Sequence, residues 1–150
     1  MPDSDDQLTS DHGWDLTGES NELKAIVDKL KSDSVRVSLF MDPVEEQISL
    51  AARLGTDRIE YYTGPYADNF PNHEQVLAPF IESAVHADSL GLGINAGHDL
   101  NLDNLAEFCQ RVPNVAEVSI GHAIVTDALW LGLTETVKRY RAILDHVATG

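Results

Sequence analysis

The stretch Gly91-Leu-Gly-Ile-Asn-Ala-Gly-His-Asp-Leu-Asn-Leu102 decides how this chain folds. The short apolar run 92–94 predicts a buried strand, and residues 95–99 predict a tight glycine-containing turn. Asn101 then opens a helical pattern as an N-cap. Because chemistry in α/β proteins is placed where strands end and helices begin, His98 lies where a titratable side chain is useful.

A second junction between a strand and a helix, which we call a joint, occurs in Val118-Ser-Ile-Gly-His-Ala-Ile124. There a strand ends in Gly121 and His122, as the strand at 92–94 is followed by Gly97 and His98. A glycine and a histidine that open a helix offer backbone N–H groups and an imidazole to a phosphate. In (β/α)8 barrels, phosphate sites commonly form after the last two strands. The alternative, that His98 and His122 are structural histidines bonded to nearby backbone, stays open from position alone.

The rest of the chain alternates between strand and helix patterns. We expect strands at 35–41, 58–62, 92–95 and 117–120, and helices at 19–30, 42–55, 72–90, 101–112, 123–130 and 133–148. Asp42 and Glu45 form a capping-box pattern, and Pro79 predicts a kink or a restart. The helix at 133–148 carries an apolar face formed by Leu133, Val137, Tyr140, Leu144 and Val147.

This alternation predicts an α/β fold with a parallel sheet. The spacing between strands is close to the roughly 30 residues per unit of a (β/α)8 barrel. Four parallel strands cannot close a barrel, so the sheet is either a small open one or half of something larger. Its unpaired edges also predict poor solubility of an isolated half-barrel.

Composition narrows the function further. The chain has 150 residues, 43% of them apolar, enough for one domain with a core. Its formal charge of −15 argues strongly against nucleic acid and anionic membranes as partners but allows an anionic substrate. No segment resembles a membrane helix or a secretory signal, and the single cysteine, Cys109, fits a cytoplasmic setting. Residues 1–7 are predicted to be an acidic, poorly ordered leader.

Glu60 stands in the middle of an apolar strand, where a carboxylate is costly unless it is paired or functional. It is a candidate acid, base or substrate anchor, or else a salt-bridge partner of Arg36 on the neighbouring strand.

Two metal-site patterns are rejected. Asp99-x-Asn101-x-Asp103 resembles a calcium loop, but Asn104 replaces the glycine that such a loop needs. His98, Asp99 and His122 lack the close His/Cys spacing typical of zinc sites. No metal is predicted.

Four motifs and a closing helix carry a family resemblance. They are Val37-Ser-Leu-Phe-Met-Asp-Pro43, Ile59-Glu-Tyr-Tyr-Thr-Gly-Pro-Tyr-Ala67, Asn95-Ala-Gly-His-Asp-Leu-Asn101, Glu117-Val-Ser-Ile-Gly-His-Ala123 and Leu133-Thr-Glu-Thr-Val-Lys-Arg-Tyr140. In this order and spacing they resemble the C-terminal part of the pyridoxine 5′-phosphate synthase family.

The resemblance implies a TIM barrel, an oligomer and a transferase of vitamin B6 (pyridoxal phosphate) biosynthesis in the cytoplasm. The implied reaction joins 1-deoxy-D-xylulose 5-phosphate to 3-amino-2-oxopropyl phosphate, giving pyridoxine 5′-phosphate, phosphate and water, without metal or organic cofactor. It assigns His98 as general acid, and Asp99, Gly121 and His122 to the amino-ketone phosphate. Thr9, in a loop that departs from the family pattern, would contact the deoxyxylulose phosphate.

Only part of the family's length is matched. Residues 8–150 are expected to form the C-terminal half of the barrel, leaving out the first four strands and the catalytic groups they carry. A truncated gene model, a half-barrel completed by another chain and a degenerate remnant are the three explanations. We expect the chain alone to be inactive. The alternative function is a non-catalytic phosphometabolite-binding or assembly module.

Overall fold

The structure, a computed structural model, describes residues 1–18 and 20–149. Its centre is a four-stranded parallel sheet in the order β1-β2-β3-β4. The strands are β1 (Ser38–Met41), β2 (Arg58–Tyr62), β3 (Gly93–His98) and β4 (Val115–Ile120). The predicted α/β fold with four parallel strands is therefore confirmed.

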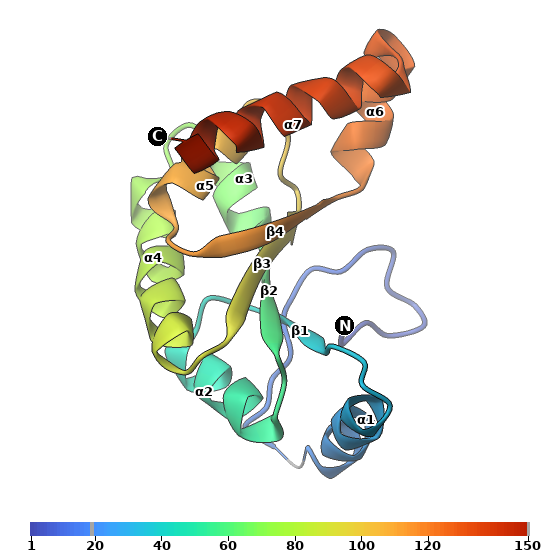
Figure 1. Cartoon of the computed structure of the whole chain (residues 1–150), viewed down its shortest axis with the longest axis vertical. Helices are drawn as coiled ribbons and strands as arrows, with labels where there is room; N and C mark the ends of the chain where they lie inside the picture. Colours follow the sequence, from blue (N-terminus) through green and yellow to red (C-terminus); the bar gives the residue numbers. More distant parts are fainter. Residues whose placement is uncertain (19, 150) are drawn as a thin grey trace.

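In the described residues, helices precede, connect and follow the strands. They are α1 (Asn21–Ser32), α2 (Glu45–Leu54), α3 (Gly64–Asn69), α4 (Glu74–Ser89), α5 (Leu105–Arg111), α6 (His122–Leu131) and α7 (Leu133–Thr149). Figure 1 shows α2, α4 and α5 along one side of the sheet and the N-terminal segment on the other. The short helix α3 falls where a loop was expected, and Glu19, in the first predicted helix, lies outside the described residues. Within the described chain, no helix is long and apolar enough to cross a membrane.

The sheet face toward these helices, which we call the convex face, is apolar. Alternate strand residues point to it and are at most 4% exposed: Leu39, Met41, Ile59, Tyr61, Ile94 and Ala96. They pack with buried helix residues such as Ile48 of α2, Phe80 of α4 and Phe108 of α5. The main core therefore lies between the sheet and its helices.

The opposite face, which we call the concave face, carries the buried Phe40 beside Tyr62 and a group of polar residues: Arg58, Glu60, Asn95, Glu117 and Ser119. Arg58 Nη1 donates to Asn95 Oδ1 at 2.8 Å and lies 3.1 Å from Glu117 Oε1. Arg36, just before β1, reaches the same Glu117 oxygen at 3.1 Å. Since β1 and β4 are the two edges of the sheet, this ion pair shows that the sheet curves around its polar side.

The predicted capping box at the start of α2 is wrong. The helix begins at Glu45, and Val44 holds the N-cap position without a side-chain bond. The Asp42 carboxylate instead accepts a hydrogen bond of 3.1 Å from the Gly13 backbone N–H. The Asp42 carboxylate, which the capping-box pattern assigned to the start of α2, therefore binds the N-terminal loop instead. At the other end of α2, Gly55 has φ 87°, as expected for a helix-ending glycine.

Two further helices differ in detail from the sequence patterns. Helix α4 runs through Pro79 without a restart, and the alternative expectation of a kink there stays a prediction. In α7 the buried residues are Thr136 and Tyr140, whereas Leu133 and Val137 are 64% and 41% exposed. Trp130 of α6 is also exposed, at 87%. The apolar face predicted for α7 is thus only partly directed into the core.

Candidate functional site

His98 is the last residue of β3, and its backbone differs from the prediction. The strand does not turn at Asn95 but continues to His98, whose φ of 85° places it in the left-handed region. Gly97 lies inside the strand. The position requires a glycine, because a Cβ there would be 2.7 Å from the Ser119 carbonyl oxygen and 2.8 Å from Glu60 Oε1. The glycine therefore permits a close approach of β4 and Glu60, and the histidine itself makes the turn.

Neighbouring strands hold this joint in place. The buried Thr63, just after β2, donates both its hydroxyl and its backbone N–H to the Gly97 carbonyl. The rings of Phe40 and Tyr62 lie 6.0 and 5.7 Å from the His98 ring. The imidazole is therefore oriented by β1 and β2 before any ligand arrives.

The two histidines predicted to form the site are neighbours. The ring centroids of His98 and His122 are 5.9 Å apart, with the rings nearly perpendicular. His122 is the first residue of α6, and Gly121 is its N-cap. The parallel pairing of β3 with β4, which aligns His98 with Ile120, brings the two joints together.

Two cavities meet at this histidine pair, which lines both. The first, about 730 Å³, is also lined by Glu60, Ser119 and Gly121. The second, about 530 Å³, holds four carboxylates, those of Asp68, Asp99, Asp103 and Asp127. Proton transfer from either imidazole can thus reach a molecule on either side.

Glu60 faces the first cavity from β2. It does not pair with Arg36, which binds Glu117, so that alternative is wrong. Its Oε2 accepts a 3.4 Å hydrogen bond from the Ser119 hydroxyl. Burial raises the pKa of Glu60, while Ser119 and the charge of His98 act in the opposite direction. A carboxyl group with a raised pKa in a cavity is a candidate proton donor or acceptor.

Asp99 sits at the start of the loop between β3 and α5. Its carbonyl accepts a hydrogen bond from the Asn104 side chain at 3.3 Å. The predicted helix start at Asn101 is a turn: Asn101 Oδ1 accepts from the backbone N–H of Asp103 and Asn104, and α5 begins at Leu105. This asparagine network fixes the backbone that follows His98.

Thr9 reaches the site from the N-terminal segment. Its Oγ1 lies 2.8 Å from Nε2 of His98, so the sequence-predicted residues Thr9, His98, Asp99, Gly121 and His122 gather at one end of the sheet. Sequence reasoning did not identify Thr63 or Ser119. Their contacts with Gly97 and Glu60 depend on strand register, which local patterns do not reveal.

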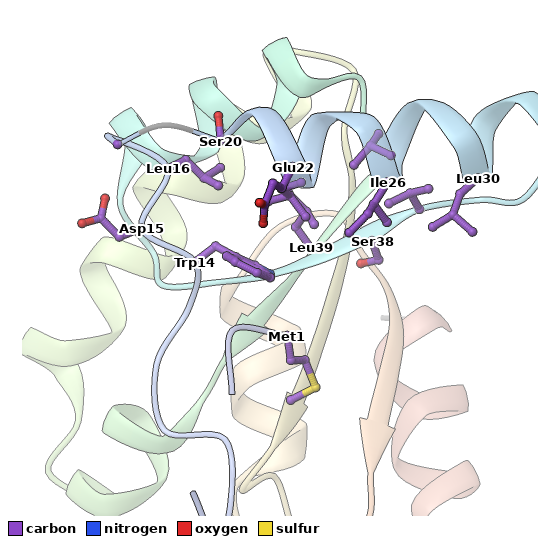
Figure 2. A pocket seen from close by; sticks show the side chains of 14 residues that line it. Met1, Trp14, Asp15, Leu16, Ser20, Glu22, Ile26, Leu30, Ser38 and Leu39 are labelled. Atoms are coloured by element: carbon purple, nitrogen blue, oxygen red, sulfur yellow. The ribbon is translucent and has the colours of Figure 1, made fainter. Parts of the chain in front are cut away.

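The structure also holds a cavity away from these residues. Figure 2 shows it between α1 and β1, about 480 Å³ in volume and lined by Trp14, Ile26, Leu30 and Leu39. Of the described residues that line it, none is a histidine or a cysteine. Its lining is mainly apolar, with the carboxylates of Asp15 and Glu22 beside it.

Metal-binding potential lies elsewhere than at the histidine pair. In the described part of the chain, the one grouping of ligand side chains with suitable spacing is His73, Glu74 and Glu107. These residues belong to the segment before α4, to α4 and to α5, in the helical layer.

Comparisons with known proteins agree with the motifs. The family model described as "Pyridoxal phosphate biosynthesis protein PdxJ" matches residues 1–146. A pyridoxine 5′-phosphate synthase of Porphyromonas gingivalis is 50% identical over 144 residues, covering 94% of this chain and 60% of the relative. Proteins of that name from Albidiferax ferrireducens and Xanthomonas campestris pv. campestris are also 50% identical, over 93% and 99% of this chain. The chain spans 56% to 60% of the length of these three relatives.

Proposed function

Because the chain belongs to the PdxJ family of pyridoxal phosphate biosynthesis proteins, we propose that it forms the general-acid and phosphate-binding part of a pyridoxine 5′-phosphate synthase. The proposed reaction condenses 1-deoxy-D-xylulose 5-phosphate with 3-amino-2-oxopropyl phosphate and releases pyridoxine 5′-phosphate, phosphate and water. The observation that carries the proposal is the His98–His122 pair at the ends of adjacent strands, lining two cavities at once. A two-substrate condensation needs such a shared wall.

The finer fold proposed is half of a (β/α)8 barrel. Two observations support it. All four strands are parallel and in sequential order, and the Arg36–Glu117 ion pair joins the two edges across the concave face. In such a barrel the histidines would stand at the carboxyl end of the strands, where barrel enzymes bind their substrates.

His98 is proposed as the general acid. Ring closure with loss of water requires a proton on the departing hydroxyl group, and an imidazole can supply it near neutral pH. Its Nε2 bonds to the exposed Thr9 hydroxyl, so a substrate oxygen can take the place of Thr9. The Phe40 and Tyr62 rings keep the imidazole directed into the site.

The phosphate group is proposed to bind at the start of α6. Gly121 is exposed and open, and the helix of ten residues begins at His122. The first N–H groups of a helix lack partners within it and attract anions. Asp99 would contribute its backbone N–H, since its carboxylate repels a phosphate, and Thr9 would approach the second substrate. A cytoplasmic homo-oligomer whose reaction uses no metal or organic cofactor completes the proposal and rests on the family resemblance.

Binding and turnover test the proposal separately. Calorimetric titration of the purified chain with each substrate and with inorganic phosphate should give saturable binding that His122→Asn weakens. His146→Asn, on the exposed side of α7, is the matched control and should bind like the parent chain. If the phosphate site is misassigned, neither the substrates nor inorganic phosphate will show saturable binding.

Turnover is measured after adding the complementary N-terminal part of the Porphyromonas gingivalis relative. The reconstituted pair should form pyridoxine 5′-phosphate, and His98→Asn should lower the rate by roughly 100-fold or more. Binding without turnover in the complemented parent chain would favour the non-catalytic binding module instead.

A further inference from the structure

A buried histidine in the helical layer faces two carboxylates. His73 precedes α4, Glu74 is the first residue of α4, and Glu107 lies on α5. One ligand atom from each of the three lies within 4.8 Å of the other two. None of the three lines the cavities that meet at His98 and His122.

His73 is 3% exposed, and neither ring nitrogen has a hydrogen-bond partner. Nε2 lies 2.9 Å from Glu107 Oε1, but the pair lacks hydrogen-bond geometry. The ring is stacked on Phe70 at 5.0 Å and meets the edge of Tyr66 at 4.9 Å, so packing fixes its direction. A buried imidazole whose nitrogens make no well-aligned hydrogen bond is costly, and a cation bound between His73 and Glu107 would satisfy it.

We propose that His73, Glu74 and Glu107 bind a divalent transition-metal ion, with Zn²⁺ as the best match. Imidazole nitrogen and carboxylate oxygen both bind zinc, and three such ligands leave a fourth tetrahedral position for water. Mg²⁺ and Ca²⁺ prefer oxygen ligands throughout and gain little from the histidine. Because the ligands come from both sides of the α4–α5 contact, the ion would link these helices.

Arg111 competes with this ion for the carboxylates. Its Nη1 lies 3.0 Å from Glu74 Oε1 and 3.7 Å from Glu107 Oε1. The Glu74–Arg111 pair is well exposed, and exposed ion pairs contribute little to stability. A divalent ion can therefore displace the guanidinium, and removing Arg111 should strengthen metal binding.

The test is a calorimetric titration of the chelator-treated, dialysed chain with zinc chloride and, separately, with magnesium chloride. We expect one saturable zinc site per chain and no comparable magnesium binding. His73→Gln should remove the zinc site. Glu107→Gln, at a more exposed position, should also remove it and provides the answer if His73→Gln does not fold, which circular dichroism checks.

Two further variants distinguish this cluster from adventitious binding by other histidines. Arg111→Gln should bind zinc more tightly than the parent chain, and His98→Asn/His122→Asn should retain the site. The proposal is overturned if zinc does not bind saturably, if the double histidine variant loses the site, or if Arg111→Gln leaves the affinity unchanged.

Discussion

The two faces of the sheet are built by different rules. On the convex face, Ile59 and Ile94 are fully buried and pack on the helices. On the concave face, Arg58, Asn95 and Glu117 remain polar and bind one another. Because side chains alternate along a strand, one side of the sheet supplies core packing and the other supplies polar groups. The same backbone fixes the positions of both.

Shortening a convex-face side chain should have the largest effect. Ile59→Ala leaves a cavity where the side chain is 0% exposed, and we expect a loss of about 2–5 kcal/mol in the free energy of unfolding. Urea denaturation followed by circular dichroism measures it. Val125→Ala, at a position 61% exposed, is the control and should change stability by less than about 0.5 kcal/mol. Equal effects at both positions would contradict the placement of the core.

Adding one methyl group at Gly97, beside Glu60 and Ser119, should have an intermediate effect. Gly97→Ala brings a Cβ to 2.7 Å from the Ser119 carbonyl, so β3 and β4 must separate. A loss of about 1–3 kcal/mol is expected from such overpacking. Gly121→Ala, where nothing lies within 4 Å of the added atom, should cost far less in the same denaturation assay. A tolerated Gly97→Ala would mean that the strands do not approach this closely.

The smallest effect is expected on the concave face and depends on pH. Burial raises the pKa of Glu60 above its ordinary value of 4.5, so the folded chain binds this proton more tightly than the unfolded chain. Stability contributed by Glu60 is therefore present below pH 4.5 and falls as pH rises through the raised pKa. Glu60→Gln removes this pH-dependent loss of stability, because glutamine does not titrate.

Thermal melts from pH 3.5 to 7.5 measure the difference. The variant should gain less than about 1 kcal/mol over the parent chain near neutrality, because the site is partly open to solvent, and the gain should shrink toward acid pH. A gain that is largest in acid would reverse the sign and contradict the proposed environment. Glu135→Gln, on the exposed side of α7, serves as the matched control.

Much of this architecture could be predicted from local patterns. Apolar, β-branched runs predicted the four strands, and the position of His98 and His122 after the last two strands predicted that both belong to one phosphate site. The failures have non-local causes. Gly97 is required by Ser119 and Glu60 on two other strands. Asp42 is taken by Gly13, and Arg36 reaches Glu117 rather than Glu60 because the sheet curves.

The outward position of Trp130 has a spectroscopic consequence. The chain contains two tryptophans, and Trp14 packs against the core beside β1 with its indole nitrogen buried. Trp130 is 87% exposed. A collisional quencher such as iodide will therefore reach Trp130 first, and the unquenched fluorescence will come mainly from Trp14. The chain carries its own pair of optical reporters, one for the α6–α7 surface and one for the folding of the N-terminal segment onto the sheet.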